Sequence, residues 1–201
     1  MRRWLLLGQL ALLAGCGGKP PALSPLGSEA TVLAFGDSLT AGTGARAGQD
    51  YPSVLAGLIG RRVVNAGVPG ETTPEGLARL PQVLDETAPD LVVLCLGGND
   101  MLRKLDLAAT RANLAQMVAL IRARGAQVVL LGVPQPRLLM LSAAEFYQPL
   151  AEELGVPIEL EALPEILAER DLKADPIHPN AAGYRLLAEA VRDLLQAAGA
   201  L

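Results

Sequence analysis

Five short apolar runs, bounded by glycine, proline, aspartate or asparagine, recur along the chain and limit what it can fold into. Runs of this kind predict strands. Because most of them lack polar alternation, we expect strands buried on both faces, as in a parallel sheet covered by helices. The runs are residues 31–35, 62–66, 91–96, 127–133 and, interrupted by Pro157 and Glu159, residues 156–160.

Helical periodicity fills the segments between the runs. Apolar residues recur at intervals of three and four at positions 114, 117, 118 and 121, and again from Tyr184 to Leu195, which is typical of amphipathic helices. Alternating strands and helices with right-handed crossovers predict an α/β fold, a three-layer α/β/α sandwich around a five-stranded parallel sheet. With 201 residues, 51% of them hydrophobic, we expect one such domain over residues 31–201.

Charge and residue counts exclude several classes of function. The formal net charge is −4, whereas a nucleic-acid partner requires clustered Lys and Arg, so we expect none. One histidine and two cysteines are too few for a zinc site of His and Cys ligands, so we expect no such metal. Any chemistry that needs an imidazole must use His178, because it is the one histidine in the sequence.

The start of the chain predicts an export signal. Two arginines precede an apolar stretch over residues 4–13, shorter than the roughly 20 residues that a spanning helix needs. The sequence Leu-Ala-Gly-Cys at residues 13–16 resembles the bacterial lipobox. We therefore expect residues 1–15 to be a signal peptide and Cys16 to carry the lipid that anchors the protein to the membrane of the cell envelope. The alternatives are an ordinary signal peptide cut near Ala14 and a chain that is not exported.

The segment after the lipobox predicts a spacer. Residues 17–30 hold three prolines and three glycines without an apolar period, so we expect residues 16–30 to be the acylated cysteine and a flexible tether reaching roughly 40 Å. By resemblance to the sorting rules of double-membrane bacteria, Gly17 after the cysteine indicates the outer membrane, facing the periplasm. Acylation of Cys16 would leave Cys95 alone, which excludes a disulfide framework.

Two of the predicted strands end in segments that suit an acyl-transfer site. Ser38 follows the first strand at a tight turn after Gly36, where its hydroxyl and N–H can face a cleft. Gly67 ends the second strand, and a glycine lets a backbone N–H approach a ligand closely. The structural alternatives are a serine that caps the next helix and a plain turn.

Two further segments carry chemistry-bearing side chains. Asn99 follows the third strand, and its amide can donate to a developing oxyanion. Asp175 precedes His178 by three residues across a proline-bearing turn, so its carboxylate can reach one ring nitrogen and leave the other free as a base. An Asn-Asp turn and a structural histidine are the alternatives.

Together, the four segments resemble the GDSL or SGNH hydrolase family, which is named for the Ser, Gly, Asn and His of its sequence blocks. Ser38, Gly67, Asn99 and His178 match these blocks over about residues 31–198. The resemblance implies the flavodoxin-like fold of that family and a triad of Ser38, Asp175 and His178. It also implies an oxyanion hole made by the N–H groups of Ser38 and Gly67 and the Asn99 amide, and no cofactor.

Three sequence segments narrow the resemblance to one branch of the family. Residues 36–42, 76–81 and 97–103 look like those of bacterial arylesterases, lysophospholipases and acyl thioesterases. The branch implies a monomer that hydrolyses carboxylic esters, and thioesters, of small alcohols, aryl groups or lysophospholipids through an acyl-enzyme.

The acyl-binding residues are less well defined by the sequence. Residues 135–147 include several apolar side chains near the expected cleft. We expect these side chains either to line an acyl pocket or to form the buried face of a helix. Two other functions stay open: a carbohydrate O-acetyl esterase and a surface lipoprotein that binds without catalysis. The six aromatic residues of the chain are few for stacking on sugar rings, and all five catalytic positions are present.

Overall fold

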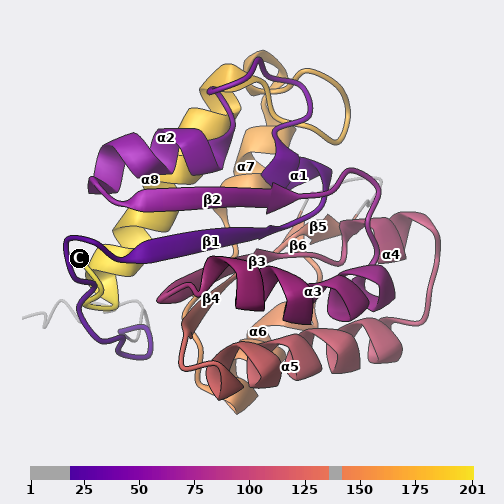
Figure 1. Cartoon of the computed structure of the whole chain (residues 1–201). Coiled ribbons are helices and arrows are strands. Elements are labelled where there is room, and N and C mark those ends of the chain that lie inside the picture. The colour runs from indigo at the N-terminus through magenta and orange to yellow at the C-terminus, as the bar shows by residue number, and fades with distance from the viewer. Residues whose placement is uncertain (1–18, 136–141) are drawn as a thin grey trace, which may run out of the picture.

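The computed structural model describes residues 19–135 and 142–201, and it is built around a five-stranded parallel sheet (Figure 1). The sheet has the order β2-β1-β3-β4-β7. Its strands are β1 (Thr31–Gly36), β2 (Arg62–Gly67), β3 (Leu91–Cys95), β4 (Gln127–Leu131) and β7 (Ile158–Glu159). The predicted α/β fold with a five-stranded parallel sheet is confirmed.

Burial differs between the centre and the edge of the sheet. Every residue of β3 is buried, and so are all but the first residues of β1 and β4. The edge strand β2 is half-exposed, with Arg62 and Asn65 open to solvent. The expectation of burial on both faces therefore fails for β2, because this strand has one neighbour, β1, in the sheet.

Helices cover both faces of the sheet. In Figure 1, α2 and α8 pack together on one face with α7, and α3, α5 and α6 lie on the other. The predicted helical periods are confirmed, since Leu114 and Ile121 of α5 and Tyr184 and Leu187 of α8 are buried. The bounds are α2 (Tyr51–Ile59), α3 (Thr73–Thr87), α5 (Leu107–Ala123), α6 (Tyr147–Leu154), α7 (Ala162–Ala168) and α8 (Ala181–Ala197).

Short elements complete the edge at which the strands end. Helices α1 (Ser38–Ala41) and α4 (Gly98–Leu102) follow β1 and β3 directly, and a 3-10 turn spans Arg170–Leu172. Strands β5 (Pro134–Gln135) and β6 (Ser142–Ala143) form a separate antiparallel pair. Strand β7 is shorter than predicted, and Pro157, which has no N–H to donate, contributes its carbonyl to Leu130.

The segment before β1 corrects the predicted spacer. The N–H groups of Leu23 and Leu26 donate to the carbonyls of Ala198 and Ala200 at 2.8 and 2.9 Å, and Leu26 is buried in the core. The apolar side chains of this segment pack against the end of α8 and the core, and their burial stabilises the fold. The prolines and glycines of the segment concealed this packing in the sequence. The prediction of a flexible tether over residues 16–30 is therefore wrong for residues 23–30, and residues 16–18 lie outside the described residues.

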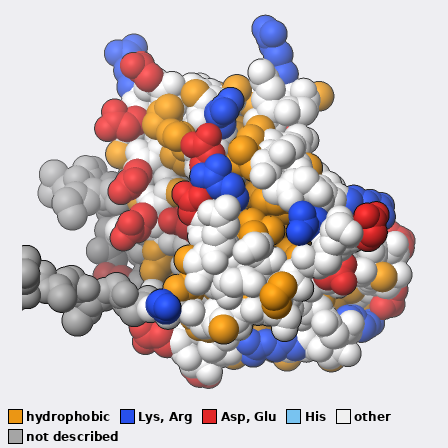
Figure 2. Space-filling model, turned by 90° about the vertical axis from the view of Figure 1, so that its left-hand side faces the viewer, with side chains coloured by type: hydrophobic (Ala, Val, Ile, Leu, Met, Phe, Trp, Pro, Cys, Tyr) orange, Lys and Arg blue, Asp and Glu red, His pale blue; other side chains and the backbone are white. Residues whose placement is uncertain are grey.

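The entry of the chain and the strand ends lie at opposite ends of the molecule. Residues 19–30 pack beside the start of β1, whereas α1 and α4 lie where the strand arrows point (Figure 1). Figure 2 views the entry end, where charged side chains of both signs lie among apolar ones. Within the described residues, no helix is long and apolar enough to cross a membrane.

The order of the strands in the sheet also predicts where a ligand binds. The chain leaves β1 toward β2 on one side and reaches β3 on the other, so the order reverses beside β1. In open α/β sheets, ligands bind outside the carboxyl ends of the strands at such a switch point. Ser38 follows β1 and Asn99 follows β3, so both residues lie at this position.

Candidate active site

Ser38 is the first residue of α1. The carboxylate of Asp37 accepts a hydrogen bond from the Leu39 N–H at 3.0 Å and caps the helix. The cap is thus Asp37 and not Ser38, which corrects the structural alternative for the serine. The hydroxyl of Ser38 is free to face His178, and its Oγ lies 2.9 Å from His178 Nε2.

His178 is oriented by Asp175 from the same loop. Its Nδ1 lies 2.7 Å from Asp175 Oδ2. Asp175 Oδ1 also accepts from the backbone N–H groups of Ile177 and His178, both at 2.9 Å. Burial acts to raise the pKa of Asp175, but the hydrogen bonds from the His178 ring and these N–H groups outweigh it and lower the pKa below its ordinary value. The carboxylate is therefore ionised at neutral pH and favours the ring tautomer with a proton on Nδ1.

Asn99 lies in α4, which begins one residue after a sharp backbone turn. Gly97 has a φ of 121°, and a Cβ there would lie 2.6 Å from Tyr147 Oη, so this turn requires glycine. The Asn99 amide donates to Asp37 Oδ2 at 3.1 Å and to the Glu71 carbonyl at 3.0 Å. Both amide protons therefore have partners within the chain.

Asp37 is the titratable residue that the sequence analysis missed. Its side chain is 1% exposed and makes no ion pair in the described part of the chain. Burial raises the pKa of Asp37 to about 7, although the Leu39 N–H and the nearby His178 act to lower it. Its place directly before Ser38 was the one signal in the sequence that could have identified it.

Gly67 approaches the site but does not line its pocket. A Cβ on this residue would lie 2.1 Å from the Ala41 nitrogen, so the end of β2 can pack on α1 only with glycine here. The Gly67 N–H donates to Asn65 Oδ1 at 2.9 Å. A role as an oxyanion donor therefore stays a prediction, and it requires this N–H to be shared with or released from Asn65.

Buried charged groups fix the loop between β2 and α3. The Glu71 carboxylate accepts two hydrogen bonds from Arg79, at 2.6 and 2.7 Å, and the guanidinium lies over the Phe35 ring. Asp100 accepts from the N–H and hydroxyl of Thr73 at 2.9 and 2.6 Å. These contacts hold the Glu71 carbonyl against Asn99, so they position the amide indirectly.

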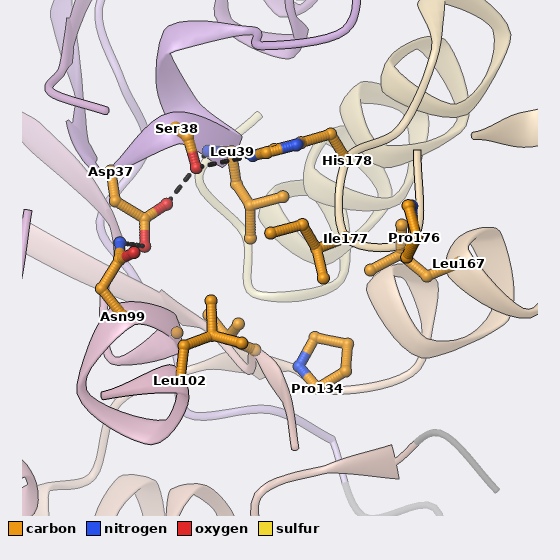
Figure 3. A pocket seen from close by; sticks show the side chains of 12 residues that line it. Asp37, Ser38, Leu39, Asn99, Leu102, Pro134, Leu167, Pro176, Ile177 and His178 are labelled. Carbon is orange, nitrogen blue, oxygen red and sulfur yellow. Dashed lines mark hydrogen bonds between the residues drawn. The ribbon is translucent and has the colours of Figure 1, made fainter. Parts of the chain in front are cut away.

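A pocket of about 240 Å³ opens beside the Ser38 hydroxyl. In Figure 3, the Ser38–His178 pair lies at one end, and Leu102 and Ile177 project toward the cavity from different walls. Most of the wall is apolar, which suits an acyl chain. The lining residues are Asp37, Ser38, Leu39, Gly98, Asn99, Leu102, Val133, Pro134, Leu167, Pro176, Ile177 and His178.

The lining of the pocket decides between the two alternatives for the aromatic residues of segment 135–147. Tyr147 is buried in the core and donates to the Leu96 carbonyl at 2.6 Å, and Phe146 packs against it. Neither aromatic ring lines the pocket. The buried alternative holds for Tyr147, the first residue of α6, whereas Phe146 precedes that helix and is half-buried. Residues 136–141 of that segment lie outside the described residues.

The structure brings together most of the predicted site. Ser38, Asn99 and His178 line one pocket, and Asp175 contacts the histidine from behind. Gly67 lies outside this lining, and Cys16 lies outside the described residues. The described residues contain no cluster of three or more His, Cys, Asp or Glu side chains that could hold a metal ion. The assembled groups can carry out nucleophilic attack with proton transfer.

Comparison with protein families gives one match over most of the chain. The model of the GDSL-like lipase/acylhydrolase family matches residues 34–186. This range includes every residue of the pocket and Asp175.

Known proteins resemble the chain at the level of sequence and structure. Esterase TesA of Pseudomonas aeruginosa is 36% identical over 203 residues, which cover 95% of this chain and 96% of the relative. The thioesterase 1/protease 1/lysophospholipase L1 of Escherichia coli strain K12 is 33% identical over 173 residues, 83% of each chain. A crystal structure of TesA has a TM-score of 0.76 and 34% identity, and the match covers 84% of this chain and 99% of the other.

Proposed function

The chain belongs to the GDSL-like lipase/acylhydrolase family and is a serine hydrolase of ester bonds, and from this premise we propose that Ser38, His178 and Asp175 are its catalytic triad. The observation that supports this assignment is the continuous line of contacts from Ser38 Oγ to His178 Nε2, and from His178 Nδ1 to Asp175. Nucleophile, base and orienting carboxylate thus lie within hydrogen-bond reach of one another.

The reaction follows from these contacts. Ser38 Oγ attacks the acyl carbon while His178 Nε2 takes the hydroxyl proton, and Asp175 stabilises the imidazolium that forms. The imidazolium gives its proton to the leaving alcohol, and the acyl group stays on Ser38. A water molecule, deprotonated by His178, then attacks the acyl-enzyme and releases the carboxylic acid.

The oxyanion would be stabilised by donors on two strand ends. The Ser38 N–H lies at the start of α1, and no hydrogen bond from it is found among the described residues. The Asn99 amide lines the same pocket, and it can serve by sharing the proton that it gives to Asp37 or to the Glu71 carbonyl. Gly67 would add a third donor if its N–H leaves Asn65.

The pocket supports a preference for acyl chains longer than acetyl. Its apolar wall includes Leu39, Leu102 and Leu167, which an acetyl group would leave largely exposed to water. The relative from Escherichia coli is a thioesterase and lysophospholipase by name, which adds thioesters and lysophospholipids as substrate classes to test. Among the described residues, no Phe, Tyr or Trp side chain lines the pocket, so these residues give no large aromatic face on which a sugar could stack.

A chain-length series tests this proposal. The mature chain, residues 16–201 with Cys16→Ser, is assayed on p-nitrophenyl esters with acyl chains of two to sixteen carbons, beside a Ser38→Ala variant. We expect kcat/KM to rise from acetyl to octanoyl and turnover to disappear in the variant. A preference for acetyl would favour a carbohydrate O-acetyl esterase. No turnover on any ester by folded protein would favour a binding lipoprotein.

We also propose that Cys16 anchors the protein to a membrane. Seven residue steps separate it from Leu23, the first of the described residues that is bonded to the end of α8, so the tether reaches at most about 25 Å. When the full chain is expressed with radioactive palmitate, the parent protein should be labelled and Cys16→Ser should not. Equal labelling of both forms, or of neither, would contradict the anchor.

A further inference from the structure

Exposed apolar side chains gather at the edge of the molecule that holds the pocket. Five of them, here called the apolar rim, are Val68, Leu102, Leu105, Leu107 and Ile177, which are 36–46% exposed. They come from the loop after β2, from α4 and the loop that follows it, from the first residue of α5, and from the turn before α8. Single apolar side chains scattered over a protein surface are normal and indicate no function. A group of them around a pocket is typical of a binding surface.

The apolar rim is continuous with the pocket. Leu102 and Ile177 are 46% and 41% exposed and also line the cavity beside Ser38, so each has one part in solvent and one part in the pocket (Figure 3). The Arg103 guanidinium donates to the Gly70 carbonyl at 2.6 Å. This bond ties the loop that carries Leu105 to the loop that carries Val68.

Two cationic side chains follow Leu102 of the apolar rim, whereas the acidic Asp106 separates Leu105 from Leu107. Arg103 and Lys104 lie between Leu102 and Leu105 in a chain whose net charge is −4. Arg103 lies 4.0 Å from Glu75, and no ion pair of Lys104 is found within residues 19–135 and 142–201. Leucines beside cations fit a surface that presents hydrocarbon below a layer of phosphate groups.

We propose that the apolar rim docks the enzyme on the surface of a phospholipid aggregate, from which one acyl chain enters the pocket. The proposal rests on the proposed esterase function and adds the physical state of the substrate. Continuity with the pocket favours lipid over a protein partner, because five side chains are few for a stable protein interface, which buries about 800 Å² on each partner. The apolar rim lies opposite the entry of residues 19–30, so a taut anchor at Cys16 would direct it away from the anchoring leaflet.

Vesicle binding tests the proposal directly. The mature chain with Cys16→Ser is sedimented with vesicles of equal parts phosphatidylcholine and phosphatidylglycerol, and with vesicles of phosphatidylcholine alone. We expect binding to both, tighter with phosphatidylglycerol, and at least tenfold weaker binding by Leu105→Glu. Leu186→Glu is the matched control, because Leu186 is 42% exposed on α8, outside the apolar rim. Leu107→Glu is a second variant, and an acidic residue at the first position of α5 does not weaken that helix.

Kinetics separate docking from catalysis. On dissolved p-nitrophenyl butyrate, both glutamate variants of the apolar rim should keep kcat/KM within twofold of the parent chain. On micellar lysophosphatidylcholine, their KM should rise at least tenfold while Leu186→Glu stays unchanged. The proposal is wrong if the parent chain binds no vesicle, or if Leu105→Glu and Leu186→Glu lose binding equally. If the parent chain does not hydrolyse the dissolved ester, that result would instead contradict the esterase proposal.

Discussion

The two sides of the active site differ in whether their functional groups are already arranged for catalysis before a substrate binds. On one side, Ser38 Oγ and His178 Nε2 lie 2.9 Å apart, and His178 Nδ1 already contacts Asp175. On the other side, the Asn99 amide donates to Asp37 and the Glu71 carbonyl, and the Gly67 N–H donates to Asn65. The proton-transfer groups are therefore assembled in advance, whereas two oxyanion donors must share or exchange a partner. The difference predicts how strongly each side responds to substitution.

The largest effect is expected on the assembled side. Replacing Ser38 with alanine removes the nucleophile, so turnover of p-nitrophenyl butyrate should fall by about four to six orders of magnitude. Ser142→Ala, at an exposed position of β6, should leave turnover unchanged. Residual activity above a hundredth of the parent value in folded Ser38→Ala would exclude Ser38 as the nucleophile.

A smaller effect is expected on the oxyanion side. Asn99→Ala should lower kcat by about two to three orders of magnitude with little change in KM, because its amide acts on the transition state. Asn113→Ala is the control, since that amide donates to Thr73 Oγ1 behind the site. A loss of less than threefold at Asn99 would mean that the amide keeps its resting partners throughout the reaction.

Asp175 should contribute less than its position in the triad implies. Its carboxylate side chain is 44% exposed, so water can partly replace it when Asp175→Ala removes the contact with His178. We expect kcat to fall about a hundredfold, at the weak end of the range for orienting carboxylates. The same ester assay, run from pH 6 to 9, measures it. An unchanged kcat across this range would place the orienting group elsewhere.

The smallest effect on rate should come with the clearest effect on stability. Asp37→Asn weakens the contact with Asn99, so kcat should fall about tenfold, the value of one hydrogen bond. The pKa of Asp37 is raised to about 7 in the folded chain. Between pH 4 and 7, the native state therefore holds a proton that the unfolded state has lost, and the stability of the parent chain declines as pH rises.

Urea unfolding at pH 5 and pH 8 measures this linkage. Asp37→Asn lacks the buried charge, so its advantage in free energy of unfolding over the parent should grow between pH 5 and pH 8, by about 3 kcal/mol. Glu86→Gln, on the exposed side of α3, should show no such growth. A constant difference between the two pH values would mean that Asp37 titrates as an ordinary carboxylate.

The same contrast shows what the sequence could predict. Ser38 and His178 are 140 positions apart, yet each follows a recognisable signal, a strand end or a proline-bearing turn, so their meeting could be predicted. The partners of Asn99 could not, because Asp37 and the Glu71 carbonyl reach it only through the packing of the loops that carry them. Leu102 and Ile177 were missed as pocket residues since neither belongs to an apolar run. The packing of Leu23 and Leu26 was concealed by the prolines and glycines around them.

The central claim is that Ser38 carries the acyl group between two halves of an ester hydrolysis. Rapid quenching of the mature chain during turnover of p-nitrophenyl octanoate, followed by peptide mass measurement, tests it most directly. The account predicts one octanoyl group on the peptide that contains Ser38, and none in Ser38→Ala. An octanoyl group on another residue, or steady hydrolysis by Ser38→Ala, would contradict it.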